Sequence, residues 1–265
     1  MSAGNFGDVW KHNVLLEVVG LIKKENFHYV ETHGNYDQHT VKHNGNALLG
    51  YHYLSKKYKY SLLPSTLYTQ INQPPGSAAP YLYRSSWMQV YELLKTSGIN
   101  SFNETIFENN PTVFSAVNPR ISSIPEICNK YENGFAEVLK LSYLPDLVLI
   151  DPYYKKTPVA EMRRVISLAN ELDKKNIPYL IWYPLHRSQK KKKQFMTHLL
   201  NYFPNNANNP RRLELHDNGN SNNRSHIPKT GMIFSNTLSR HIQTIKTNLN
   251  YLDSSSNLSL NWTIV

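Results

Sequence analysis

Residues 147–154 read LVLIDPYY, an apolar run that ends at an acid, a proline and two tyrosines. Four consecutive apolar residues indicate a strand buried on both faces of a parallel sheet. Because an ionised carboxylate is not buried without a partner, we expect Asp151 to face a crevice at the carboxyl end of this strand. Pro152 lacks a backbone N–H, so its carbonyl can point at a ligand, and Tyr153 and Tyr154 offer flat rings for stacking. Together these groups suit the exocyclic amino group of a planar base.

The segments on either side alternate between helix and strand patterns. Helical spacing of apolar residues predicts helices at residues 8–26, 74–83, 135–142, 157–176, 188–203 and 238–252. Short apolar or alternating runs predict strands at residues 27–32, 87–93, 146–150, 178–184, 211–216, 231–236 and 258–265. One more strand is expected between residues 109 and 133, where TVFSAVN and IPEICNKY compete for it and the pattern alone does not decide.

Strands alternating with helices of this length predict an α/β fold, with a mostly parallel sheet and helices on both faces. A chain of 265 residues is long enough for one such domain, which we expect to span residues 1–265. Residues 37–73 are polar and rich in tyrosine, and we interpret them as an inserted helical subdomain.

The charge of the chain favours a polyanionic partner. Lysine and arginine number 29 against 19 acidic residues, which gives a formal net charge of +10, and nucleic acid is the usual partner of such a protein. The single cysteine excludes an intrachain disulfide and fits a reducing cytoplasm. We expect no membrane span, because no apolar run approaches about 20 residues, and no metal site, because the 11 histidines form no cluster with ligand spacing.

A series of motifs along the chain resembles one known family. In chain order they are AGNFGDVWKHNVL, YVETHG, PGS, YEL, NGF, LVLIDPYY, IWYP and TGMIFSN. The combination resembles the 23S ribosomal RNA adenine-N6 methyltransferases over nearly the whole chain. The resemblance implies a Rossmann-like methyltransferase fold with a seven-stranded sheet, S-adenosylmethionine as methyl donor and ribosomal RNA as partner. We expect a cytoplasmic monomer.

The resemblance also implies roles for individual positions. The positions that match cofactor-binding residues of the family are His12, His33, Gly34, Ser77, Glu92, Asn133, Gly134 and Asp151. The catalytic candidates are Asp151, Pro152 and Tyr154, and the substrate-binding candidates are Lys11, Tyr153 and Tyr154; of these, Lys11, Asp151 and Tyr154 match residues of the family. Glu92 corresponds to the acid after the second strand, where a carboxylate can bind the ribose hydroxyls of the cofactor.

Three positions depart from the pattern of the family. Tyr153 stands where the family has proline, Asn133 replaces an acid, and the loop after the first strand reads HGNYD in place of the glycine-rich HAGAG. Two alternatives therefore stay open. The chain could be a catalytically decayed methyltransferase fold that binds nucleic acid, or it could act on DNA, through adenine methylation or the use of external DNA.

Overall fold

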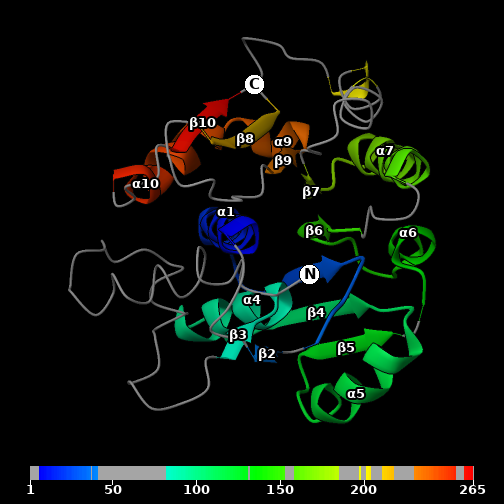
Figure 1. Cartoon of the computed structure of the whole chain (residues 1–265). Coiled ribbons are helices and arrows are strands. Elements are labelled where there is room, and N and C mark those ends of the chain that lie inside the picture. Colours follow the sequence, from blue (N-terminus) through cyan, green and yellow to red (C-terminus); the bar gives the residue numbers. More distant parts are fainter. Residues whose placement is uncertain are drawn as a thin grey trace.

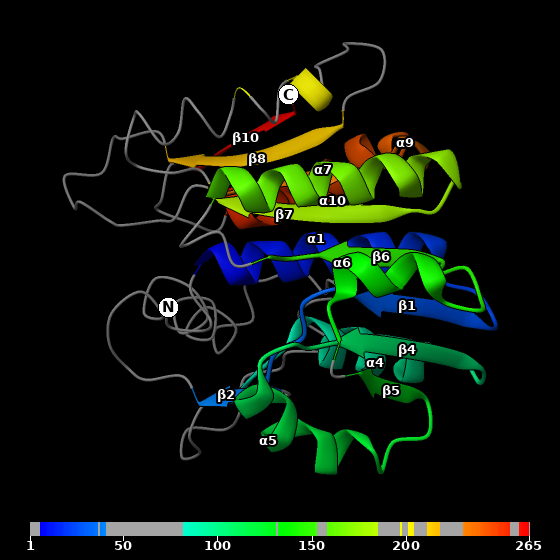
Figure 2. The same cartoon turned by 90° about the vertical axis from the view of Figure 1, so that its right-hand side faces the viewer.

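A central sheet with helices on both faces organises the chain (Figures 1 and 2). The computed structural model describes residues 6–36, 38–40, 82–130, 132–152, 158–184, 197, 201–203, 211–217, 230–254 and 260–264. A small second sheet pairs β2 (Gln38–Thr40) with β3 (Leu82–Arg84) in antiparallel fashion. Among the described helices, none has the length and apolar character needed to cross a membrane.

The central sheet has eight strands in the order β10-β8-β9-β7-β6-β1-β4-β5. They are β1 (Phe27–Glu31), β4 (Phe102–Phe107), β5 (Ile127–Lys130), β6 (Leu147–Ile150), β7 (Tyr179–Pro184), β8 (Arg212–Asp217), β9 (Thr230–Phe234) and β10 (Leu260–Ile264). Five neighbours, β5, β4, β1, β6 and β7, run parallel. β9 lies antiparallel between β7 and β8, and β10 pairs antiparallel with β8. The mostly parallel sheet is confirmed, and β10 extends the expected seven strands by one at the edge.

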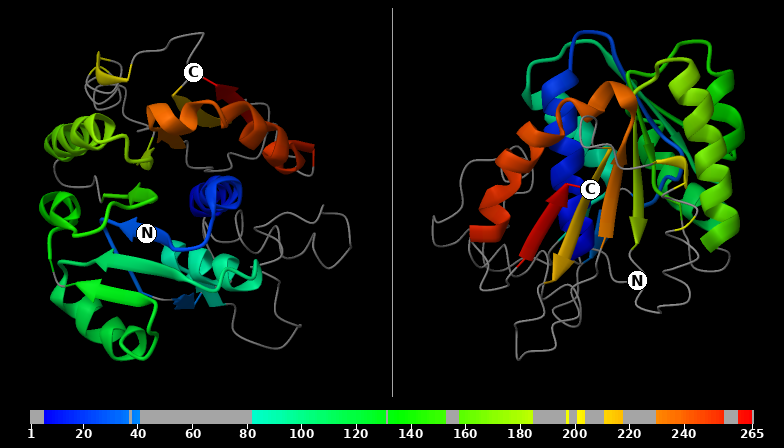
Figure 3. Two further views of the ribbon diagram at one scale, coloured as in Figure 1. Left: turned by 180° about the vertical axis from the view of Figure 1, so that it is seen from behind. Right: turned by 90° about the horizontal axis from the view of Figure 1, so that it is seen from above.

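Helices cover this sheet on both sides. They are α1 (Phe6–Ile22), α4 (Ser86–Thr96), α5 (Pro111–Ile121), α6 (Gly134–Glu137), the 3₁₀ turn η2 (Val138–Lys140), α7 (Pro158–Lys174), α9 (Asn236–Ser239) and α10 (Ile242–Ser254). One core cluster joins the sheet to α1, α4 and α10, and a second packs α7 against the other face. Seen from above, the strands β7, β9, β8 and β10 lie side by side, with α7 and α10 to either side (Figure 3).

The helix α1 is buried on nearly all sides, because it lies between the sheet, α4 and α10 (Figure 1). Its residues Val9, Trp10, Val14 and Val18 are fully buried. Apolar residues on most faces of a helix suit a place in the interior of a domain. This position brings the first turns of α1 to the carboxyl ends of the parallel strands.

Several sequence-based assignments differ from the structure. Residues 87–93, predicted as a strand, lie in α4, and the second parallel strand along the chain is β4, which the pattern did not reveal. Of the two competing segments, ICNK forms β5 and TVFSAVN lies in α5. The end of the helix predicted at 74–83 is the strand β3. The predicted helix at 135–142 is shorter, since α6 passes into η2.

Some predictions fall outside the described residues. Of the subdomain expected at 37–73, the structure describes only the strand β2, and most of the helix expected at 188–203 is not described. Ser77, Tyr153 and Tyr154 also lie outside the described residues.

Candidate active site

A cavity of about 630 Å³ lies at the carboxyl ends of β6, β1 and β4, three neighbouring strands of the sheet. Each of these strands contributes an acid to the lining: Asp151 follows β6, Glu31 ends β1, and Glu108 follows β4. The first turns of α1, the start of α4 and Trp182 on β7 complete the lining. Open parallel sheets bind their ligands at this edge, and the volume is within the range of small-molecule sites.

Asp151 forms an ion pair with Lys11, which α1 brings to the end of β6. The Nζ atom of Lys11 lies 2.6 Å from Oδ2 of Asp151, and both side chains are largely buried. Burial lowers the pKa of Lys11, but the negative charges of Asp151 and Asp8 raise it more, so the net pKa lies above its ordinary value. The ammonium also lies 5.7 Å from the ring centroid of Trp182, a cation–π contact. Lys11 therefore stays charged inside the cavity.

Glu31 is a buried carboxyl group held from two sides. Ser86 Oγ donates to Oε1 at 2.6 Å, and the hydroxyl of Tyr29 donates to Oε2 at 3.1 Å. Burial raises the pKa of Glu31 to about 7, although the hydrogen bond from Ser86 lowers it. The charge of this group therefore changes near neutral pH.

Glu108, the acid that follows β4, also lines the cavity. The backbone N–H of Asn110 donates to Oε1 of Glu108 at 2.6 Å, and burial raises the pKa of Glu108. Gly34 approaches this strand end closely, since its N–H donates to the carbonyl of Phe107 at 2.6 Å. A Cβ atom on Gly34 would lie 2.7 Å from Cγ2 of Ile106. Only glycine therefore fits at this position, where the chain after β1 packs against the end of β4.

Two histidines line the same cavity. The Nδ1 atom of His12 lies 2.7 Å from both the hydroxyl of Tyr83 and Nε2 of Gln89. Because Nε2 of Gln89 also donates to the carbonyl of Arg84 at 2.9 Å, this atom is the amide nitrogen, and Nδ1 of His12 accepts. Burial lowers the pKa of His33 to about 4, which keeps that ring neutral near neutral pH.

The structure brings six of the predicted site residues together. The lining of the cavity includes Lys11, His12, His33, Gly34, Asp151 and Pro152. Glu92 is not among the lining residues: it lies within α4, so the expectation that it follows a strand is wrong. Asn133 is exposed and caps α6, with its Oδ1 accepting from Phe135 at 3.0 Å. Gly134 packs against the backbone of Thr32, beside the cavity and not in its lining.

Sequence reasoning missed the two acids of the site that stand at strand ends, Glu31 and Glu108. Both have the signal that identified Asp151, a carboxylate directly after a buried run. In YVE the acid ends the apolar run of β1, and in TIFE the acid follows the apolar end of β4. Glu108 has the position that was expected of Glu92, directly after the second parallel strand along the chain.

No protein-family model matches the chain, and no curated protein matches it. Among solved structures, the Legionella pneumophila protein LPL1258, which carries the family label DUF519, is similar with a TM-score of 0.71. The two sequences are 20% identical, and the match covers 98% of this chain and 97% of the other. A match of this kind shows a shared fold.

Two more distant structures are an rRNA methylase from Streptococcus thermophilus and the N-methyltransferase NodS from Bradyrhizobium japonicum. The first has a TM-score of 0.41 at 8% identity and covers 85% of this chain and 93% of its own. The second has a TM-score of 0.39 at 9% identity and covers 86% and 94%. Likenesses this distant say nothing of the function of this chain. The strand order, with one reversed hairpin after five parallel strands, is that of the Rossmann-like methyltransferase fold implied by the sequence resemblance.

Proposed function

We propose that this protein transfers a methyl group from S-adenosylmethionine to N6 of an adenine in large-subunit ribosomal RNA. The observation that carries the proposal is the position of Asp151. Its carboxylate follows β6, lines the cavity and forms an ion pair with Lys11, and Pro152 lies beside it in the same lining. A carboxylate and a neighbouring backbone carbonyl are the acceptors that the amino group of a flipped adenine requires.

The residues present fit S-adenosylmethionine. Glu108 at the end of β4 is placed to accept hydrogen bonds from ribose hydroxyls, and Glu31 offers a carboxylate to a cationic group. Gly34 lines the same cavity and packs closely against the end of β4. When bound, the cofactor would supply a methyl group activated by a sulfonium. His12 and His33 line the same cavity, and we propose them with Gly34 and Asp151 as cofactor contacts, while Ser77, Asn133 and Gly134 remain predictions from the resemblance.

In the proposed reaction Asp151 orients the attacking nitrogen. The lone pair on N6 is delocalised into the ring, so the amino group is a poor nucleophile. Since Lys11 occupies Oδ2 of Asp151, the Oδ1 atom remains to accept one N6 hydrogen, and the Pro152 carbonyl would accept the other. Both acceptors draw the lone pair towards the methyl group, and this positioning supplies much of the acceleration. The proton leaves after transfer, because the methylated cation is strongly acidic.

Substrate contacts extend beyond the acceptors. Lys11 and Trp182 lie next to Asp151 in the cavity, and we propose that they form a wall beside the target base. Tyr154 is proposed to stack on the base and Tyr153 to flank it. The net charge of +10 supports an RNA partner, whose phosphates would contact lysines and arginines.

Analysis of ribosomal RNA by mass spectrometry tests this proposal. A strain that lacks the gene should lose one N6-methyladenine, and the wild-type gene should restore it whereas Asp151→Ala should not. Asp146→Ala is a matched control, since Asp146 pairs with Lys24 away from the cavity lining. An unchanged modification profile in the deletion strain would reject the proposal. Methyl incorporation into protein-free ribosomal RNA and into DNA, measured side by side, separates RNA from DNA as substrate.

A further inference from the structure

The ring of His33 is held at one edge by Thr32, the residue before it in the chain. The Nδ1 atom of His33 lies 2.7 Å from Oγ1 of Thr32. Thr32 is buried, and its backbone N–H donates to the carbonyl of Leu149 in β6 at 3.0 Å, which fixes the residue to the sheet. The hydroxyl group therefore has a defined place between the histidine ring and β6.

This hydroxyl group determines which nitrogen of His33 carries the proton. Its single hydrogen is donated to the carbonyl of Leu149 at 3.3 Å, so Oγ1 meets the ring as an acceptor. The hydrogen of the neutral ring then lies on Nδ1, and Nε2 keeps a lone pair. Since burial lowers the pKa of His33 to about 4, the ring keeps this form of one donor and one acceptor near neutral pH.

Phe135 fixes the plane of the same ring. It stands in the first turn of α6 and packs edge to face against His33, with ring centroids 4.7 Å apart and an angle of 71° between the planes. This is a favourable arrangement of two aromatic rings. The helix α6 begins beside the end of β1 (Figure 2), where a Cβ atom on Gly134 would lie 2.6 Å from Cα of Thr32. Because this segment is packed so closely, Phe135 and Thr32 together restrict the ring to one orientation.

The second ring nitrogen, Nε2, reaches the cavity. His33 lines the cavity, and in the described part of the chain its hydrogen-bond partner is Thr32, at Nδ1. Nε2 is not among the described polar atoms that are buried without a partner, so it borders open space. An acceptor in this place suits a ligand that donates a hydrogen bond. The described lining also includes four acids, which favour a positively charged donor: Asp8, Glu31, Glu108 and Asp151.

We propose that Thr32 and Phe135 are positioning residues, which hold His33 in the form protonated at Nδ1 so that Nε2 accepts a hydrogen bond from the ammonium group of the cofactor. This inference rests on the proposed function and adds to it two residues that act through the histidine ring. It also gives the NGF segment a role in shaping the site, since Gly134 packs against Thr32 and Phe135 orients His33.

NMR spectroscopy of ¹⁵N-labelled protein reads the position of the proton near neutral pH without any ligand. The signals of His33 are those that disappear in His33→Gln, and in the wild type they should show the proton on Nδ1. Thr32→Val keeps the shape of the side chain but removes the acceptor, so the ring should change to the form protonated at Nε2, which is usual for histidine in water. Thr32→Ser should restore the proton on Nδ1. A proton on Nε2 in the wild type, or on Nδ1 in Thr32→Val, would overturn the proposal.

Calorimetric titration with two ligands that differ by one group tests the link to the cofactor. S-adenosylhomocysteine has the ammonium group, and S-adenosyl-4-thiobutyrate is the same molecule without it. Thr32→Val and Phe135→Leu should each weaken binding of S-adenosylhomocysteine by about fivefold, as for loss of one hydrogen bond. The same variants should change the affinity for the second ligand by less than about twofold. Equal losses for both ligands, or no loss for either, would overturn the role in cofactor binding.

Thr105→Val is the matched control. The hydroxyl group of Thr105 lies 3.0 Å from Nε2 of His28, which is also a threonine–histidine contact but lies outside the cavity lining. This variant should leave the proton position of His33 and both affinities unchanged, and thermal unfolding checks that each variant is folded. If the wild type binds neither ligand, the proposed function fails and the assigned ligand fails with it, whereas the NMR result still decides the role of Thr32.

Discussion

Lys11 and Asp151 are separated by 140 positions in the sequence, yet their Nζ and Oδ2 atoms are 2.6 Å apart. The contact joins the start of α1 to the end of β6 across the cavity. Because Lys11 holds one carboxylate oxygen, the conformation of Asp151 is set before any ligand arrives. The ion pair therefore links the packing of the first helix to the orientation of the proposed acceptor group.

Replacing Lys11 with methionine should lower both stability and activity. The two side chains are only 11% and 17% exposed, so Lys11→Met leaves a carboxylate without its partner in a largely buried place. Breaking such a pair costs about 3 kcal/mol, which urea denaturation measures as a lower free energy of unfolding. Adding Asp151→Asn to this variant should restore part of the stability, because the second change removes the unpaired charge. Additive losses in the double variant would contradict the pairing.

The affinity for S-adenosylmethionine should increase with pH through Glu31. Burial raises the pKa of Glu31 to about 7, so the group is protonated and neutral below that pH and ionised above it. A cationic ligand favours the ionised form, and affinity should rise about tenfold from about pH 5.5 to about pH 7. Glu31→Gln stays neutral and should bind more weakly, with a flat pH profile. The measurement is calorimetric titration at several pH values, and an equal slope in the variant would exclude Glu31 as its source.

The parts of the fold that the sequence predicted have simple patterns. The strand β6 is four apolar residues followed by an acid, and α7 has apolar residues at helical spacing. The strand β4 was missed because it contains Asn103, Glu104 and Thr105 in its middle, which resembles an exposed loop. Tertiary packing buries Glu104 fully, although carboxyl groups are usually exposed. No local sequence pattern predicts this burial.

The error at Glu92 lies in the strand predicted at residues 87–93. The resemblance matched Glu92 in VYEL to the acid after the second strand, but Ser85 caps a helix there, and Trp87, Val90 and Leu94 recur at helical spacing. Six of the predicted site residues line the cavity because they belong to strand ends or to α1. The partners of these residues, such as Tyr83 for His12, are distant in sequence, and periodicity does not reveal such contacts.

Gly134→Ala should destabilise the protein and disturb the cavity. A Cβ atom at this position would lie 2.6 Å from Cα and 2.8 Å from the carbonyl carbon of Thr32, and backbone atoms cannot move aside without shifting β1. We expect a loss of about 2 kcal/mol in the free energy of unfolding, together with weaker binding of S-adenosylhomocysteine, because His33 follows Thr32. The measurements are urea denaturation and calorimetric titration.

Gly98→Ala is the matched control for crowding. Nothing lies within 4 Å of a Cβ atom at Gly98, but its φ of 73° strains any other residue. This variant should lose about 1 kcal/mol from backbone strain alone, and ligand affinity should stay unchanged. A larger loss for Gly98→Ala than for Gly134→Ala would show that packing against Thr32 is unimportant.

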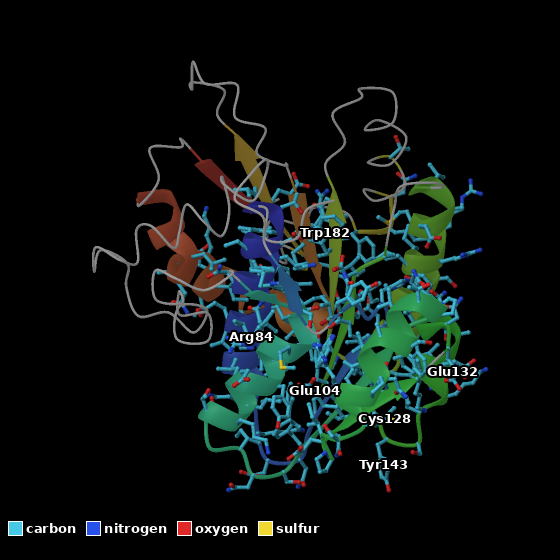
Figure 4. The ribbon with its side chains drawn as sticks, turned by 60° about the horizontal axis from the view of Figure 1, so that its bottom comes forward. Arg84, Glu104, Cys128, Glu132, Tyr143 and Trp182 are labelled. Carbon is cyan, nitrogen blue, oxygen red and sulfur yellow. The ribbon has the colours of Figure 1, made fainter. Side chains whose placement is uncertain are left out.

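Glu104→Met should stabilise the protein at neutral and higher pH. The carboxyl group of Glu104 is fully buried and has no hydrogen-bond partner in the described part of the chain (Figure 4). Burial, together with the negative charges of Glu31 and Glu126, raises its pKa well above the ordinary value. The folded protein therefore binds a proton that the unfolded chain releases above about pH 4.5, and the stability contributed by this group falls as pH rises.

Replacement by methionine removes this penalty, so the gain in free energy of unfolding should grow from about pH 5 to about pH 8 and reach about 1–2 kcal/mol. Glu104→Gln separates the cost of the titrating charge from the cost of a buried polar group. It removes the charge but keeps the polar group, so its gain should grow with pH in the same way and be smaller than that of Glu104→Met. Urea denaturation at both pH values measures these differences. A methionine variant that is less stable than the wild type at pH 8, or whose effect is the same at both pH values, would show that Glu104 has a partner that holds its charge.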